Sequence, residues 1–264
     1  MADVETGTGT ASAPVVTIAE GRATIRLNRP RHHNRLEPDD LAVLRESFTR
    51  IEREPSVRVL VLTGTGASFC SGFHLGAFDD SDSAAVDGPH LFERTVDALE
   101  ALPVPTICRL NGGVYGGATD LALACDFRVG VDTLTLRMPA ARLGLHYYPS
   151  GLRRYVSRLG LATAKRLFLL ADEVRAAELL ALGYLDRMVP LAQLDAAVAA
   201  IADALAAGAP LALRGMKTSL NEIARGEFDL ERLRARQAVC AASDDLREGR
   251  AAFAAKRPAR FTGR

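Results

Sequence analysis

The 264-residue sequence lacks tryptophan, and only 6% of its residues are aromatic. It has four cysteines, whose spacing forms neither a CxxC pair nor a Cys/His ligand pattern. A zinc site or a disulfide framework is therefore not expected, and we predict no bound metal. We interpret the four cysteines as reduced thiols of a cytoplasmic protein, with Cys70 and Cys125 as core residues.

Long hydrophobic runs and an excess of charge are also missing. No apolar run reaches the roughly 18 residues of a membrane-spanning helix, and no basic-then-apolar leader opens the sequence. The 33 basic and 32 acidic residues leave a net charge of +1. This balance gives no reason to expect a nucleic acid or an anionic membrane as partner. With 48% hydrophobic residues, the chain can instead bury a sizeable core.

The pattern along the chain predicts an α/β protein in three parts. Residues 1–14 are small and polar, which predicts a disordered tail. Strand-like segments with helices between them come first, and helices dominate after Gly151. We divide the chain into a core of residues 15–205 and a C-terminal helical region of residues 206–264. Within the third part, the mixed-charge stretch 230–256 predicts one long helix.

One stretch, Asn111 to Asp126, organises the rest. A short β-branched run leads into a loop with four glycines, and a helix-forming run follows. Glycine lets a ligand approach the backbone, and the first N–H groups of a helix lack partners. The N–H of Gly117 could thus hold a carbonyl oxygen that becomes an oxyanion, with Asp120 one turn away. The alternative is a tight turn with a solvated Asp120.

Four blocks of the sequence resemble the crotonase superfamily, the enoyl-CoA hydratase/isomerase family. They are residues 28–36, with Asn-Arg-Pro and Asn-Arg-Leu; 68–75, Ser-Phe-Cys-Ser-Gly-Phe-His-Leu; 111–126; and 252–257, Ala-Phe-Ala-Ala-Lys-Arg. Their order and spacing match the family's, and the resemblance covers residues 15–264.

The resemblance implies a spiral of ββα units followed by a C-terminal helical trimerisation region. It also implies an acyl-CoA thioester as substrate, without a separate cofactor, and a homotrimer or dimer of trimers. An acyl-carrier protein could take the place of CoA. By motif position, the backbone N–H groups of Phe73 and Gly117 would form the oxyanion hole.

The side chains depart from the family's pattern. Hydratases use two glutamates, which fall here on Asp120 and on Ala140. The residues that could compensate lie in the loop 144–149, where His146, Tyr147 and Tyr148 are candidates to contact substrate. The alternative for the tyrosines is aromatic packing beneath the acyl group.

The resemblance also predicts further substrate-binding residues within or near the matched motifs. They are Arg29, Asn34, Arg35, Leu36, Ser71, Gly72, His74, Leu75, Gly116, Ala140 and Arg142, together with Phe253 and Lys256 near CoA bound to a neighbouring subunit. Arg142 could anchor a carboxylate on the substrate or form a surface ion pair.

The sequence therefore predicts an enzyme that stabilises a thioester enolate, with enoyl-CoA isomerase or hydratase-like proton transfer by Asp120. Two alternatives stay open: a decarboxylase or C–C lyase that uses the loop tyrosines, and a non-catalytic acyl-CoA-binding scaffold. Because Ala140 has no proton to move, we do not expect an efficient two-acid hydratase.

Overall fold

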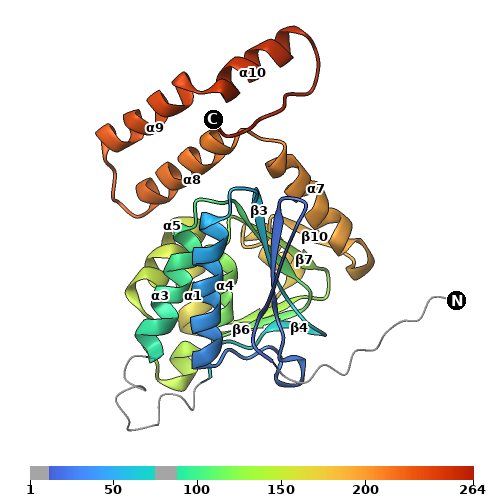
Figure 1. Cartoon of the computed structure of the whole chain (residues 1–264). Coiled ribbons are helices and arrows are strands. Elements are labelled where there is room, and N and C mark those ends of the chain that lie inside the picture. The colour runs from blue at the N-terminus through green and yellow to red at the C-terminus, as the bar shows by residue number, and fades with distance from the viewer. Residues whose placement is uncertain (1–11, 75–87) are drawn as a thin grey trace, which may run out of the picture.

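The computed structural model describes residues 12–74 and 88–264 (Figure 1). Its strands are β1 (Val15–Ala19), β2 (Arg22–Leu27), β3 (Val59–Gly64), β4 (Ser68–Cys70), β5 (Thr106–Leu110), β6 (Gly113–Tyr115), β7 (Phe127–Val131), β8 (Thr135–Arg137), β9 (Val174–Arg175) and β10 (Arg187–Val189). They form two sheets, of order β1-β2-β3-β5-β7-β10 and β4-β6-β8-β9. Pairing is parallel except for β1 with β2 and β8 with β9.

The helices follow the strands in a regular order. They are α1 (Pro38–Arg53), α3 (Gly88–Ala101), α4 (Gly117–Ala124), α5 (Pro149–Lys165), α6 (Ala176–Ala181), α7 (Leu194–Ala206), α8 (Pro210–Ala224), α9 (Leu230–Ala242) and α10 (Asp244–Ala254). Short turns of helix are η1 (Pro30–His32), η3 (Ala140–Leu143), η4 (Arg166–Leu170) and η5 (Leu191–Gln193).

A repeated unit builds the fold. In β3-β4-α3, β5-β6-α4 and β7-β8-α5, the first strand joins the larger sheet, the second joins the smaller sheet, and a helix follows. This confirms the expected spiral of ββα units. The carboxyl ends of β4 and β6 consequently lie side by side, because these two strands pair in parallel.

Helices cover the larger sheet. Figure 1 shows α1, α3, α4 and α5 stacked beside the strands, with α7 beyond them on the other side. All six residues of β3 are buried, as its continuous apolar sequence predicts for a strand covered on both faces. Cys70, Cys108 and Cys125 are fully buried in this core, so the prediction for Cys70 and Cys125 is confirmed. Burial raises the pKa of the Cys70 thiol to about 12.

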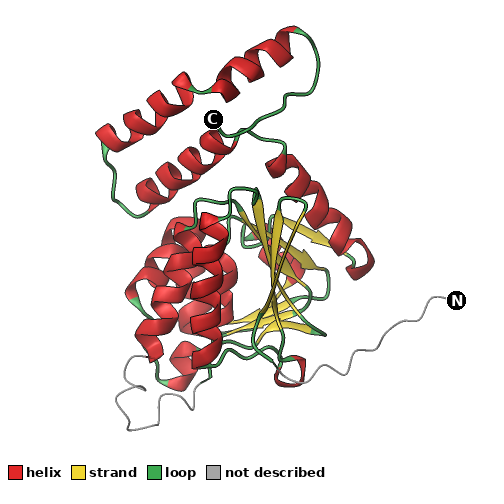
Figure 2. Ribbon diagram, viewed as in Figure 1, coloured by secondary structure: helices red, strands yellow, loops and turns green. Residues whose placement is uncertain are grey.

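The C-terminal region is an arm of helices beside the body (Figure 2). The prediction of one helix over residues 230–256 is wrong, because α9 ends and α10 begins around Ser243. Ser243 has an extended ψ of 154°, and its hydroxyl accepts the N–H of Leu246 at 3.1 Å. A serine cap thus starts a new helix where periodicity alone predicts continuation. The division at residue 205 stays a prediction.

Two further outcomes concern the ends and the surface. Of the expected tail, residues 1–11 lie outside the described part, and the Ser12 N–H donates to the carbonyl of Asn28 at 3.1 Å. Across residues 12–74 and 88–264, no single helix has the length and apolar content to cross a membrane. One pair bent by 106°, Leu191–Ala206 with Pro210–Ala224, passes that test only in combination.

Candidate active site

A cavity of about 680 Å³ lies at the carboxyl ends of β4 and β6. The described parts of its wall come from residues 71–74, the first turns of α3, residues 115–117 and the segment 138–149. Most of the side chains in this wall are apolar or aromatic. Of the predicted site residues, it brings together Arg35, Ser71, Gly72, Phe73, His74, Gly116, Gly117, Ala140, His146, Tyr147 and Tyr148.

Glycines give this end of the cavity its backbone geometry. Gly116 has φ 55° and ψ −132°, a conformation that residues with a Cβ rarely adopt. Gly72 has φ 96°, and a Cβ there would lie 3.1 Å from the Gly117 nitrogen. The segments 72–73 and 116–117 are therefore in close backbone contact, which only glycine at position 72 permits.

The backbone N–H groups of Phe73 and Gly117 belong to these two segments. Leu36 forms a parallel bridge with Phe73, in which Gly72 O and His74 N bond to Leu36. Since alternate residues of an extended chain point opposite ways, the N–H of Phe73 faces away from Leu36. Gly117 is the first residue of α4, so its N–H has no acceptor within the helix. The positive end of the helix dipole adds to the attraction for an anion there.

Asp120 lies one turn after Gly117, as predicted, but it is fully buried and is not part of the cavity wall. Its Oδ2 accepts hydrogen bonds from the Tyr148 hydroxyl at 2.5 Å and from Arg154 Nη1 at 2.6 Å. Its Oδ1 has no hydrogen-bond partner among the described residues. Burial raises the pKa of Asp120, and the Arg154 guanidinium opposes that rise. Asp120 therefore reaches the cavity through Tyr148.

Arg154 belongs to an ionic network that the sequence reading missed. It is fully buried in α5 and donates to Asp120, to Glu100 at 2.9 Å and to Asp97 at 2.6 Å. Burial alone would lower the pKa of Arg154, but the carboxylates of Asp120 and Glu100 raise it. The guanidinium of Arg154 therefore stays positively charged and compensates the negative charge of Asp120. Without such a partner, a buried ion would be costly.

Tyr147 and Tyr148 form the part of the wall nearest Asp120. Their rings stack with centroids 4.2 Å apart, and the Tyr147 hydroxyl donates to that of Tyr148 at 3.1 Å. Burial and the nearby Asp120 charge raise the pKa of both phenols well above the usual value. Both therefore stay protonated and form a chain of hydroxyls that ends on Asp120. Gly151 makes room for it, since a Cβ there would lie 2.4 Å from the Tyr147 ring.

The remaining loop residues differ in what they can reach. Ala140 lines the cavity and brings only a methyl group to it. Its match to the family's second glutamate stays a prediction. His146 also lines it, with its Nδ1 2.8 Å from the Tyr147 carbonyl oxygen. Arg142 lies outside the wall, and its Nη2 donates to the Leu170 carbonyl at 3.2 Å. That contact does not favour Arg142 as the anchor of a substrate carboxylate.

The first motif block has mainly structural contacts. The buried side-chain amide of Asn34 donates to the carbonyls of Thr65 at 2.8 Å and Ser68 at 2.9 Å. Arg29 pairs with Asp40 at 2.8 Å, and Leu36 is buried in the core. Direct contact of Arg29, Asn34 and Leu36 with an acyl-CoA therefore stays a prediction.

Arg35 and His74 lie at the rim of the cavity. Both bind Glu37, with Arg35 Nη2 2.6 Å and His74 Nδ1 2.9 Å from its carboxylate oxygens. Both are half-buried and line the cavity, so Glu37 fixes two side chains at one edge. Leu75, the last predicted residue of this block, lies outside the described residues.

Comparison with known proteins identifies the family. The sequence model described as enoyl-CoA hydratase/isomerase matches residues 17–264. Crotonyl-CoA hydratase of Syntrophomonas wolfei is 31% identical over 249 residues, which cover 92% of this chain and 95% of that protein. The chain belongs to the enoyl-CoA hydratase/isomerase family. It is thus an enzyme of the crotonase superfamily.

Solved structures of the enoyl-CoA hydratase/isomerase family agree with this assignment. The crystal structure of a putative enoyl-CoA hydratase from Streptomyces coelicolor A3(2) has a TM-score of 0.88 and 32% identity, with full coverage of both chains. An enoyl-CoA hydratase from Bacillus anthracis has a TM-score of 0.89 and 28% identity, and the match covers 96% of this chain and all of that one. The expected crotonase fold is therefore confirmed.

The family's C-terminal motif lies on the arm, away from the cavity wall. Phe253 is 88% exposed at the end of α10. Lys256 follows the helix with φ 51°, a left-handed conformation typical of helix ends. The contact of Phe253 and Lys256 with CoA of a neighbouring subunit stays a prediction.

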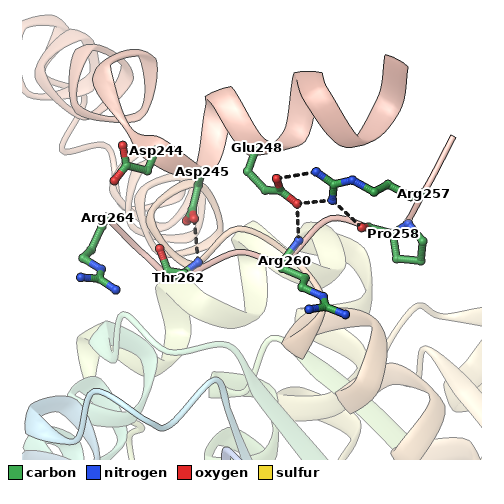
Figure 3. A pocket seen from close by; sticks show the side chains of 8 residues that line it. All are labelled: Asp244, Asp245, Glu248, Arg257, Pro258, Arg260, Thr262 and Arg264. Carbon is green, nitrogen blue, oxygen red and sulfur yellow. Dashed lines mark hydrogen bonds and ion pairs between the residues drawn. The ribbon is translucent and has the colours of Figure 1, made fainter. Parts of the chain in front are cut away.

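A larger cavity of about 850 Å³ lies between α10 and the segment after it (Figure 3). There Glu248 pairs with Arg257 at 2.6 Å, and the Asp245 carboxylate accepts the N–H groups of Thr262 at 2.7 Å and Gly263 at 2.9 Å. These contacts hold residues 257–264 against α10, which gives the acidic side chains a structural role.

The structure adds three residues of α3 to the family site that the sequence reading missed: His90, Phe92 and Glu93. A signal for this helix was present, because Glu93, Asp97 and Glu100 recur at helical spacing. The segment of α5 carries three arginines, Arg153, Arg154 and Arg158, of which the last two are four residues apart and share one face. Opposite charges on the faces of two helices are consistent with helices that pack together, as α3 and α5 do through Arg154 and Glu100.

Proposed function

We propose that this enzyme binds an acyl-CoA thioester in the 680 Å³ cavity and stabilises its enolate with the N–H groups of Phe73 and Gly117. The observation that supports the proposal is the close backbone contact between Gly72 and Gly117, next to Phe73, whose N–H points away from its bridge partner Leu36. Two such donors, fixed before the reaction, stabilise the charge that develops on the thioester oxygen. The apolar wall excludes water and strengthens the interaction.

The proton transfer that fits best is of the enoyl-CoA hydratase or isomerase type, with Asp120 as acid/base through Tyr148. In a hydration, a water gives a proton to the Tyr148 oxygen while Tyr148 passes its own to Asp120. The water oxygen bonds to the β-carbon, and the double-bond electrons move to the thioester oxygen in the hole. The hydroxyl-to-carboxylate distance of 2.5 Å supports this transfer. The reaction ends when the α-carbon takes up a proton supplied by solvent and Asp120 releases its proton to solvent through Tyr148.

A second function is favoured by the tyrosines themselves. Decarboxylation or C–C cleavage also produces an enolate, yet it needs no acid at the position of Ala140. Tyr147 and Tyr148 could then orient the leaving group. The third possibility is a scaffold that binds acyl-CoA without turnover, in which the buried Asp120–Arg154 pair is only structural.

Proton exchange and hydration separate these functions. The purified protein is incubated with butyryl-CoA in deuterated water, and loss of the α-proton signal is followed by NMR; hydration of crotonyl-CoA is followed in parallel. We expect exchange at the α-carbon together with hydration or isomerisation. Tight binding of butyryl-CoA without either reaction would support the scaffold, and exchange without hydration or isomerisation would favour cleavage.

CoA as the carrier, the trimeric assembly and the cytoplasm as location belong to the same proposal. The family supports a CoA thioester, and the net charge of +1 gives no preference for the acidic surface of an acyl-carrier protein. Comparing turnover of the same acyl group on CoA and on acyl-carrier protein tests the first point.

A further inference from the structure

The cavity contains a carboxylate that lies outside the family motifs matched above. Of the described residues that line it, Glu93 alone is acidic, whereas Asp120 lies behind Tyr148. Ala140 offers no acid at the position of the second glutamate. The described wall therefore includes one acidic residue, and α3 supplies it.

Contacts of Phe92 place this turn of α3 beside the proposed oxyanion hole. The ring of Phe92, the preceding residue of α3, is 5.7 Å from the Phe73 ring and 5.9 Å from the Tyr148 ring between centroids. The same ring lies against Gly117, where an added Cβ would come within 2.7 Å of it. The turn of α3 that carries Glu93 thus packs on the two segments whose N–H groups would hold the thioester oxygen.

The carboxylate of Glu93 is also held in place. Its Oε1 accepts the Ser150 hydroxyl at 2.9 Å and the Ser150 N–H at 3.3 Å, at the start of α5. The loop before α5 is consequently fixed by two acids, Asp120 through Tyr148 and Glu93 through Ser150. Binding through Oε1 leaves Oε2 as the oxygen that can turn toward the cavity.

We propose that Glu93 is the group that exchanges a proton with the α-carbon of the bound thioester. This rests on the proposed function. Glu93 takes the α-proton, the C–H electron pair moves into the thioester, and the enolate oxygen stays in the hole. Return of the proton to the α-carbon restores the substrate; return to the γ-carbon of a 3-enoyl thioester gives the 2-enoyl isomer. In hydration, a proton from solvent reaches the α-carbon through the Glu93 carboxyl, and Asp120 returns the proton of the water to solvent through Tyr148.

The division of labour has a chemical reason. A proton moves readily between oxygens along hydroxyls, which suits the Tyr148–Asp120 unit for a proton of water. A C–H proton needs a base in direct contact with the carbon, within about 3 Å in the reactive complex. Of the two acids, Glu93 lines the cavity and Asp120 does not.

Matched variants test this in the full-length protein. Glu93→Gln keeps an oxygen that accepts from Ser150 and loses basicity; Ser150→Ala keeps the carboxylate and loses the hydroxyl tie. Glu46→Gln makes the same chemical change on the exposed face of α1. We expect Glu93→Gln to lower the rate of α-proton exchange in butyryl-CoA by about 10²–10⁴. Ser150→Ala should stay within about tenfold of wild type, and Glu46→Gln should match wild type.

The outcomes are distinguishable. Equal losses in Glu93→Gln and Ser150→Ala would show that Glu93 only caps α5, and wild-type exchange in Glu93→Gln would show that another base acts; either result overturns the assignment. Absence of exchange, hydration and isomerisation in the wild type would instead overturn the proposed function. Calorimetry checks that the Glu93→Gln variant still binds butyryl-CoA.

Discussion

Single glycines determine the backbone geometry at the proposed oxyanion hole. Gly72 and Gly116 have positive φ values, which residues with a Cβ rarely adopt, and Gly117 lies against the Phe92 ring. A Cβ at Gly72 would also crowd the Tyr115 carbonyl oxygen and the Gly117 nitrogen. The proposed chemistry therefore depends on the backbone at this scale, with side chains as walls and proton carriers.

Replacing Gly117 tests the hole directly. Gly117→Pro removes the N–H, and we expect turnover to fall by at least about 10². Gly117→Ala keeps the N–H but meets Phe92, so it reports the steric part of the loss. Steady-state kinetics on one acyl-CoA compares the two. If the folded Pro variant is as active as the Ala variant, the Gly117 N–H is not a donor to substrate.

Asp120 and Tyr148 should behave as one unit. Asp120→Asn keeps the size of the side chain and loses its basicity, and Tyr148→Phe removes the link to the cavity. Each should lower hydration by about 10²–10⁴. Because both changes interrupt the same path, the double variant should be no slower than the slower single variant. Additive losses in kcat would contradict a path from the cavity through Tyr148 to Asp120.

At the scale of whole elements, buried charges on two helices pair beneath the candidate active site. Helix α3 contributes Asp97 and Glu100, and α5 contributes Arg154, so the two helices are joined by ions beneath the tyrosines. Burial of an ion pair is costly, but loss of one partner costs more because the other charge remains.

Arg154→Met should show this cost. The variant leaves Asp120 and Glu100 buried near one another with less compensation, and we expect the free energy of unfolding to fall by about 3–5 kcal/mol. Urea unfolding followed by circular dichroism measures it. Arg142→Met, which breaks one exposed contact on the loop, is the control. Equal free energies of unfolding for the two variants would mean that the ionic network does not stabilise the packing of α3 against α5.

Periodicity and turn signals predicted most elements because these depend on neighbours in sequence. The buried strand β3, the glycine loop before α4 and the helical second half all follow from local patterns. The division of 230–256 at Ser243 was missed, although serine followed by two aspartates is a helix-start signal. Asp120 was placed correctly on α4, but its partners Tyr148 and Arg154 lie 28 and 34 residues away, beyond the reach of a local pattern.

At the scale of the whole molecule, the arm leaves an apolar face open. Met216, Leu220 and Ile223 are 56%, 65% and 48% exposed. Their spacing of four and three residues puts them on one face of α8. Monomeric proteins seldom leave such a stripe in water, and the family resemblance implies trimers. We therefore predict a homotrimer or a dimer of trimers with this face at a subunit contact.

Sedimentation velocity at micromolar concentration measures the oligomeric state. Introducing a charge into the exposed apolar face of α8 tests whether that face forms the subunit contact. Leu220→Glu would bury an unpaired carboxylate if α8 lies at a contact, so the variant should sediment as a smaller species. Glu231→Gln, on the exposed start of α9, serves as the control. A wild-type protein that sediments as a stable monomer would contradict the prediction. An unchanged oligomer in Leu220→Glu would show that the subunit contact does not involve this face of α8.

If Phe253 and Lys256 do bind CoA on a neighbouring subunit, dissociation should also raise KM for the CoA thioester more than it lowers kcat, because it removes binding contacts far from the reacting carbon.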